Sequence, residues 1–160
     1  MEYMILPFKR YFDFNGRSRR KEFWLFQLLN FIVAMVLAGP FYFSVVNSAI
    51  SNGADMSGSD TATMEAAMAD MGGGTMIMLG LYGLYALAAF IPSIAVTIRR
   101  LHDRDMSGWW YLGVIVASFI PFVNFIAVIA FIVLMVLPGT QGANRFGPDP
   151  KDPTSAEVFS

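Results

Sequence analysis

The chain has 160 residues, which is room for one domain. Hydrophobic residues make up 56% of it and charged residues only 14%, whereas a soluble domain carries about 25% charged residues. A surface that meets only water is therefore excluded. The net charge of −1 indicates no partner by itself. The absence of cysteine and the single histidine exclude disulfides, thiolate nucleophiles and multi-histidine metal sites, so we expect no metal and no cofactor.

The first predicted element is an interfacial N-terminal segment that precedes the first apolar run. Its aromatic and aliphatic side chains suit a segment lying in the membrane interface. Cations from Arg17 to Lys21 stand directly before the run and would attract anionic lipid headgroups, at about 1 kcal/mol each. We favour an orientation signal and lipid anchor, and a site for a phosphate-bearing ligand is the alternative.

Residues 23–46 and 75–98 are two uncharged, apolar runs. Each would form a helix roughly 36 Å long, at about 1.5 Å per residue, and the hydrocarbon core of a bilayer is about 30 Å thick. Both runs therefore predict membrane spans. The first is too long for the core of a cleaved signal peptide, so we expect it to be retained.

The charged residues between the runs predict the orientation. Loop 47–74 has acidic residues and no basic one, whereas the segment before residue 23 and loop 99–108 are rich in Lys and Arg. Because basic residues favour the cytoplasmic side, we expect the N-terminus and loop 99–108 in the cytoplasm and loop 47–74 outside. Within the external loop we expect a short surface helix over 61–71, capped by Asp60. Its methionines suit Cu(I), but we favour a packing role.

The second run carries a stripe of small residues on one face of its predicted helix. Such a stripe lets another helix approach closely, within the chain or in a homo-oligomer. No charged residue lies inside any of the apolar runs, which counts against a proton-coupled transporter. The predicted packing residues are Gly83, Ala86, Ala89, Ser93 and Thr97.

The third run, 109–137, would be about 43 Å long as one helix, too long for an untilted crossing. Pro121 removes a helical hydrogen bond near its middle. Two alternatives stay open: a tilted, kinked span that leaves the C-terminus outside, or two half-helices that meet near Pro121 and return the C-terminus inside. Residues 151–160 are expected to form a flexible tail.

The loop after the second run holds the residues best suited to chemistry. If the helix continues, Arg99, His102 and Asp103 share one face. A histidine beside a carboxylate can act as a general base. The alternative, which we favour, is a salt-bridged corner in which the two aspartates of this loop pair with Arg20 or Lys21.

Three stretches together form a recognisable pattern. They are FNGRSRRKEFW at 14–24, IRRLHDR at 98–104 followed by SGWW at 107–110, and PGT at 138–140 followed by Gly142 and by NRFGPDP at 144–150. In these motifs the chain resembles the small bacterial inner-membrane proteins catalogued as domain of unknown function 805, over nearly its whole length. The resemblance implies a location in the bacterial cytoplasmic membrane and a helical fold, with no established activity. Loop 47–74 is longer than in the shortest members of that family.

These features predict an all-α integral membrane protein, a small bundle of three transmembrane runs in one domain over residues 1–150. Our leading hypothesis is a non-enzymatic component that binds a membrane protein, an anionic lipid headgroup or a phosphate-bearing ligand, and no nucleic acid. If the tail returns inside, all three motifs meet in a cytoplasmic rim. That rim comprises Arg17, Arg20, Glu22, Arg99, Arg100, His102, Asp103, Arg104, Asn144 and Arg145. The alternatives are a transporter subunit or small-solute permease and, more weakly, a membrane enzyme that uses His102 and Asp103.

Overall fold

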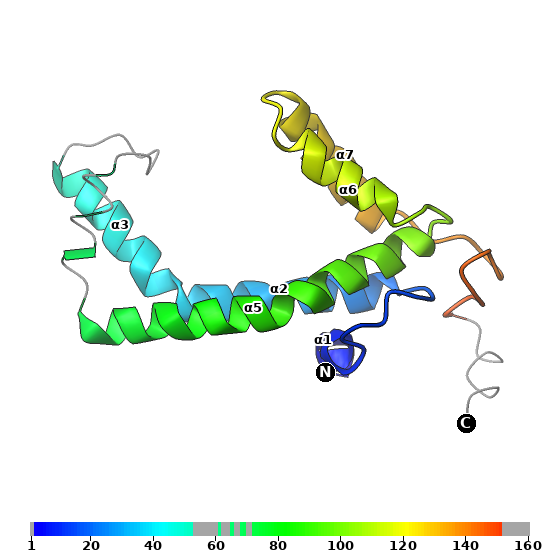
Figure 1. The fold of residues 1–160 in the computed structure, drawn as a ribbon, viewed down its shortest axis with the longest axis horizontal. Helices are drawn as coiled ribbons and strands as arrows, with labels where there is room; N and C mark the ends of the chain where they lie inside the picture. Colours follow the sequence, from blue (N-terminus) through cyan, green and yellow to red (C-terminus); the bar gives the residue numbers. More distant parts are fainter. Residues whose placement is uncertain (1, 53–60, 62–64, 66–67, 70–71, 152–160) are drawn as a thin grey trace. The chain divides into compact units, whose positions relative to one another are not determined.

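The computed structural model describes residues 2–52, 61, 65, 68–69 and 72–151, and this part of the chain is helical (Figure 1). No strand occurs in these residues, only an isolated bridge between Asn144 and Gly147, so the predicted all-α class is confirmed. The helices are α1 (Glu2–Lys9), α2 (Arg20–Leu37), α3 (Gly39–Asn52), α5 (Gly73–His102), α6 (Trp109–Ala117) and α7 (Val123–Val136).

Two predicted segments fall largely where the structure gives no description. Of the short helix expected over 61–71, only residues 61, 65, 68 and 69 are described, and these four are helical. The remainder of that helix, and residues 152–160 of the expected tail, lie outside the described residues.

One described helix, α5, is long and apolar enough to cross a membrane by itself. Helices α2 and α3 meet such a criterion only together, and they are bent by 57° where they join. Pro40 stands at this break, and a proline both lacks an N–H and crowds the preceding turn. By length and composition, the described chain thus holds one candidate span, or two if α2 and α3 form one broken span, and the predicted three-span bundle is not confirmed in that detail.

The chain divides into two compact units. One comprises Met1–Leu28 with Phe90–Ser160, and the other comprises Leu29–Ala89. Helices α2 and α5 each contribute a part to both. The single membrane domain expected over residues 1–150 stays a prediction.

The unit Leu29–Ala89 presents large apolar side chains on its outside, including Phe31, Phe43 and Leu87. Exposed apolar surface of this extent is typical of a face that meets lipid or protein. Inside the unit, the Tyr85 hydroxyl donates a hydrogen bond of 2.7 Å to Oδ1 of Asn30. A pair of polar side chains that satisfy each other suits an apolar environment, where an unpaired group is costly.

The small-residue stripe of α5 is only partly covered. Ala89 and Thr97 are buried and Ser93 is half-buried, whereas Gly83 and Ala86 are exposed. A Cβ added at Gly83 would meet no other atom within 4 Å. A close helix approach at that end of the stripe stays a prediction for a further helix or a second copy.

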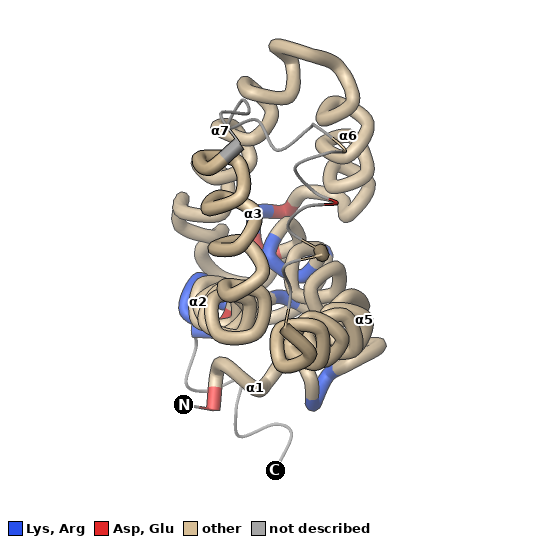
Figure 2. The backbone as a smooth tube through the Cα atoms, turned by 90° about the vertical axis from the view of Figure 1, so that its left-hand side faces the viewer, with Lys and Arg blue, Asp and Glu red and all other residues tan. Residues whose placement is uncertain are grey.

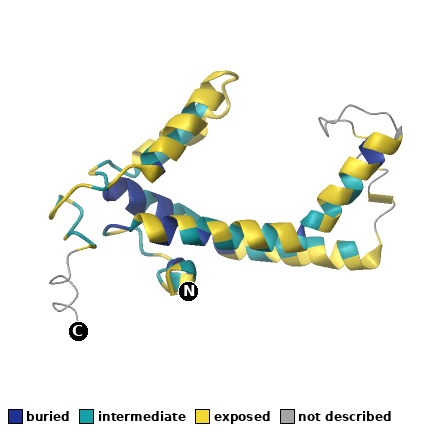
Figure 3. Cartoon of the chain, turned by 180° about the vertical axis from the view of Figure 1, so that it is seen from behind, coloured by how far each residue is buried: buried dark blue, intermediate teal, exposed yellow. Residues whose placement is uncertain are grey.

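The apolar core of the other unit lies around the C-terminal end of α5, where buried residues concentrate (Figure 3). Fully burying one such side chain stabilises the fold by roughly 1.5–3 kcal/mol. The core consists of Phe23, Phe26, Val96, Leu101 and Met135, and Phe8, Met106, Tyr111, Phe131 and Leu134 pack against it. It therefore joins α1, α2, α5, α6 and α7.

Residues 109–137 form two helices, α6 and α7, which lie side by side as an antiparallel hairpin (Figure 1). The rings of Tyr111 and Phe131 face each other across it, with centroids 6.1 Å apart. At the tip, Phe122 has a φ of 66° and the N–H of Val123 donates to the carbonyl of Pro121. Of the two alternatives for this run, the structure has the separate helices, and the chain after α7 returns to the end of α5.

Candidate functional site: an arginine network at the end of α5

Helix α5 ends in a turn that fixes the site. The N–H of Met106 donates to the carbonyl of Leu101, and the N–H of Asp105 donates to that of His102. With Asp105 at φ 58°, this is the Schellman arrangement, in which a left-handed residue closes the helix. Glycine usually takes that position, but aspartate tolerates it. Met106 then packs on the core beside Leu101.

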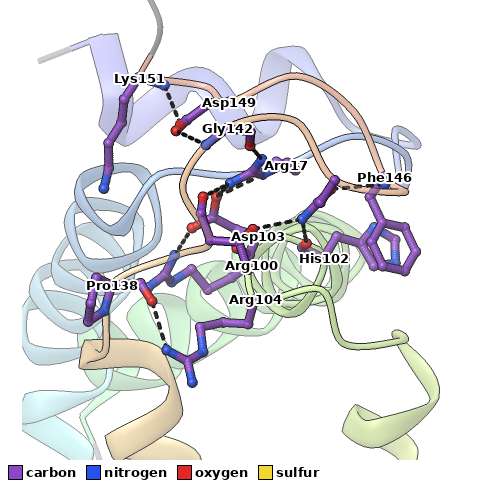
Figure 4. A network of polar contacts seen from close by, with 12 residues as sticks. Arg17, Arg100, His102, Asp103, Arg104, Pro138, Gly142, Phe146, Asp149 and Lys151 are labelled. Carbon is purple, nitrogen blue, oxygen red and sulfur yellow. Dashed lines mark hydrogen bonds and ion pairs between the residues drawn. The ribbon is translucent and has the colours of Figure 1, made fainter.

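Asp103 lies at the centre of the network, and it is 2% exposed (Figure 4). Arg17 contacts its Oδ1 through Nε at 3.0 Å and through Nη2 at 2.9 Å. Arg100, one turn earlier on α5, pairs with Oδ2. A Cβ at Gly139 would overlap the carboxylate, so glycine is required where the tail passes it. One carboxylate thereby neutralises part of the charge of two buried guanidiniums.

The tail after α7 is bound to this centre by backbone groups. Arg17 donates to the carbonyls of Thr140 and Gly142, both at 2.6 Å. The N–H of Thr140 donates to the carbonyl of Asp103 at 2.8 Å. The Asn144 amide donates to the carbonyl of His102 at 2.9 Å. The PGT and NRFG motifs are therefore the strap that returns to the end of α5.

Three arginines bind the carbonyls at the end of α7. The last carbonyls of a helix have no partner within it and carry partial negative charge. Arg20 donates to Val136 at 3.1 Å, and Arg104 donates to Pro138 at 2.7 Å. Arg100 donates to Leu137 and, at 3.4 Å, to Met135. Four successive carbonyls, of residues 135–138, are satisfied in this way.

A second buried ion pair holds the N-terminal segment. Arg99 is fully buried and contacts the Glu22 carboxylate at 3.0 Å. It also donates to the carbonyl of Asp13 at 2.8 Å, and its own carbonyl accepts from the N–H of Ser18 at 3.1 Å. Burial lowers the pKa of Arg99, and Glu22 opposes that shift.

His102 takes a structural position rather than that of a general base. Its ring stacks on Phe146, with centroids 3.9 Å apart and the planes 5° from parallel. Its Nδ1 donates to the carbonyl of Gly16 at 3.2 Å, since a carbonyl can only accept. Burial is the main cause that lowers the pKa of His102, and the nearby Arg145 lowers it further. The carboxylate of Asp103 faces Arg17 and Arg100 instead of the His102 ring.

The ion pairs differ from those that the sequence suggested. Asp103 pairs with Arg17 and Arg100, and Asp105 pairs with Arg145 at 3.1 Å, so the expected pairing of these aspartates with Arg20 or Lys21 is wrong. The reason is geometric, because Arg20 begins α2 and is directed at the end of α7. Charged residues are absent from α3, α6 and α7 and gather around these contacts (Figure 2).

All ten rim residues lie in this network, but in two different settings. Arg17, Glu22, Arg99, Arg100, His102 and Asp103 are buried. The others are partly or well exposed, namely Arg20, Arg104, Asn144 and Arg145. The sequence reasoning missed Asp13, Gly139, Thr140 and Phe146. Gly139 and Thr140 belong to the PGT motif and Phe146 to the NRFG motif, and these motifs were the only signal for them.

Two grooves adjoin the network. One, of about 470 Å³, is lined by His102 and Ser107 and by apolar side chains of α5 and α6, among them Ile98 and Tyr111. The other, of about 660 Å³, is lined by Arg20, Lys21, Trp24, Leu25 and Val136. Within the described residues no three His, Asp or Glu side chains are grouped so as to hold a metal ion.

The fold and the site define a class: a small protein, helical and largely apolar on its outside in the described residues, whose N-terminal segment and returning strap are joined by a buried arginine network. Residues 11–148 match the family model described as "Protein of unknown function (DUF805)", so the chain belongs to that family. It is 36% identical to the Escherichia coli inner membrane protein YhaH, over 94% of this chain and 98% of that protein. It is 33% identical to inner membrane protein YhaI of the same species, over 94% and 97%.

A more distant relative is the uncharacterized protein YiiR of Escherichia coli, 27% identical over 88% of each chain. No solved structure matches this chain. These relatives support a location in the bacterial inner membrane, and the predicted family and inner-membrane character are confirmed.

Proposed function

We propose that this chain is a multi-pass, non-enzymatic binding component of the bacterial inner membrane, and that its cytoplasmic face binds a phosphate-bearing group. The observation that carries the proposal is the division of charge in the network. Its acids Asp13, Glu22, Asp103 and Asp105 each lie against an arginine. Arg20 and Arg104 instead bond to neutral carbonyls of the α7 end.

This uneven division of charge favours the binding of an anion. Burial lowers the pKa of Arg100, and the charges of Arg20 and Arg104 lie close enough to lower it further, so the cations converge. The partial negative charge of a helix end offsets only a part of them. Guanidinium groups bind phosphate well because their N–H donors match its oxygens. A phosphate group would complete the neutralisation of this surface.

The network also supports a topology. Helix α5 is long and apolar enough to cross the membrane, and at its end the carbonyl of Arg99 accepts the N–H of Ser18. The chain between Ser18 and the start of α5 therefore has to cross as well, which makes α2 and α3 one broken span. Lys and Arg around this end indicate the cytoplasmic side. We propose that the N-terminus is cytoplasmic and that loop 47–74 is external.

The same reasoning supports a cytoplasmic tail. Thr140 and Gly142 bind Arg17, so the tail lies on the side of the N-terminal segment. At about 1.5 Å per residue, α6 and α7 are roughly 14 and 21 Å long, short of the ~30 Å hydrocarbon core. We propose a hairpin that enters the bilayer from the cytoplasmic side and returns to it. The internal hydrogen bonds of its helices suit that environment.

The non-enzymatic part of the proposal is supported by the buried pairing of Asp103 and the stacked position of His102. Neither side chain is arranged to take a proton from a bound substrate. The residues best placed to meet a ligand are the exposed cations, and these hold a charge rather than transfer a proton.

Anion binding is tested with inorganic phosphate and the purified protein in a zwitterionic detergent. The melting temperature is compared in phosphate and in chloride at equal ionic strength, because a ligand that binds only the folded state raises it. We expect a rise with phosphate that shrinks in a double variant, Arg20→Gln with Arg104→Gln. Lys9→Gln, which removes an exposed charge from α1, should keep the full rise. Equal melting temperatures in the two salts would refute the proposal.

A further inference from the structure

We propose that the groove between the first turn of α2 and the last turn of α7 is a site for one anionic phospholipid. This inference rests on the proposed function, since it names the molecule that carries the phosphate. The groove measures about 660 Å³, and Arg20, Lys21, Trp24, Leu25 and Val136 line it.

The headgroup end of the groove is cationic. Arg20 and Lys21 are exposed side chains of adjacent residues in the first turn of α2. Arg20 uses one N–H for the carbonyl of Val136, and a guanidinium has five. The neighbouring acid, Glu22, is buried and turned to Arg99, so it does not neutralise the groove. Two positive charges are thus available to a phosphodiester.

The other end of the groove is apolar and suits an acyl chain. Trp24 is 41% exposed, and its ring stands edge-on to the buried Phe23 at 5.4 Å. Tryptophan favours the depth of the headgroups in a membrane. Leu28 and Val133 are also exposed, and they share a helix face with the lining residues Trp24 and Val136, because residues three or four apart on a helix are neighbours. A soluble phosphate would leave this part of the groove empty.

The spatial order of charges and apolar surface along the groove therefore favours the binding of an amphiphile. Along the groove, the cationic residues come first, then the tryptophan ring and then the apolar surface. A phospholipid has its phosphate, glycerol and acyl chain in the same order. The lipid would also bridge α2 and α7, the elements that Arg20 already joins through Val136. Anionic lipid at this point would therefore hold the hairpin to the core.

The proposal is tested with lipids whose chains carry bromine, which quenches nearby tryptophan fluorescence. Trp109→Phe and Trp110→Phe leave Trp24 as the single tryptophan. This protein is placed in phosphatidylcholine nanodiscs with increasing fractions of brominated phosphatidylglycerol or brominated phosphatidylcholine. We expect phosphatidylglycerol to quench Trp24 at a clearly lower mole fraction.

Single changes then assign the preference to the groove. A cation near the membrane surface contributes about fivefold in affinity, so Lys21→Gln should raise the mole fraction for half-quenching about fivefold. It leaves the bond from Arg20 to Val136 untouched. Arg20→Gln with Lys21→Gln should abolish the preference, and Lys9→Gln, a charge change of the same kind on α1, should leave it unchanged.

Two results would overturn the lipid site. Equal quenching by the two lipids would leave a soluble phosphate or an acidic peptide as the occupant. An equal loss in Lys9→Gln and Lys21→Gln would reduce the preference to general surface charge. If the phosphate-dependent rise in melting temperature persists in either case, the proposed anion binding stands and only the lipid assignment fails.

Discussion

Arg17 and Asp103 form a buried ion pair between residues that are 86 positions apart in the chain. The guanidinium that makes this pair also binds the carbonyls of Thr140 and Gly142. One side chain from the N-terminal segment therefore joins the end of α5 to the returning tail. The buried residues of the network join segments of the chain, and its exposed cations are accessible to other molecules.

Removing the central charge should be strongly destabilising. In Asp103→Asn the side chain keeps its shape, but Arg17 and Arg100 lose their carboxylate and stay buried. Leaving a buried charge unpaired typically costs about 3–5 kcal/mol. Denaturant unfolding of the purified protein measures the loss. Asp105→Asn is the matched control, because its pair with Arg145 is exposed and asparagine tolerates the left-handed position. A similar loss in both variants would contradict the central role of Asp103.

Gly139 should not accept a side chain. Gly139→Ala places a methyl group in the Asp103 carboxylate, so the tail must shift and the ion pairs weaken. We expect a loss of roughly 1–3 kcal/mol, the usual range for overpacking. Limited proteolysis of the tail should also become faster. Gly113→Ala has open space around its Cβ in α6 and should be neutral or stabilising. Equal behaviour of the two variants would argue against the strap.

The turn at Phe122 should be relieved by glycine. A bulky residue at φ 66° is strained, and such a conformation costs about 1–3 kcal/mol. Phe122→Gly is expected to raise the melting temperature. Phe119→Gly removes an equally exposed ring from a residue without positive φ, and it should bring no gain. Stabilisation by neither variant would indicate that the tip has another conformation.

Stability should fall on mild acidification because of His102. Its pKa is lowered in the folded protein, chiefly by burial, so the unfolded chain binds the proton more readily. The stabilising effect of the neutral ring is complete above the unfolded pKa of about 6.5, and it is lost as the pH falls from there towards the folded pKa. The chain has one histidine, so His102→Gln should remove the part of this slope that begins at about pH 6.5. A slope that persists in the variant would assign it to other groups.

The sequence predicted the helical class and the long apolar helix α5, but it did not show the 57° break between α2 and α3 in the first run. It did not predict the pairing, because spacing along α5 shows which residues share a face and not which distant segment meets them. Arg17 could be placed before α2 but not against Asp103. The helix end at Asp105 lacked the usual glycine signal. The run 109–137 is uncharged and mostly apolar, so periodicity could not separate one span from two helices, and only the structure shows the two helices and the returning tail.

The most direct test of the account is the side of the membrane on which the C-terminus lies. Reporter fusions after the last residue, one with alkaline phosphatase and one with green fluorescent protein, are compared with fusions in loop 47–74. The account predicts a fluorescent, phosphatase-inactive C-terminal fusion and a phosphatase-active fusion in the loop. An active phosphatase at the C-terminus would contradict the hairpin, since Thr140 and Gly142 could not then bind Arg17 on the cytoplasmic side.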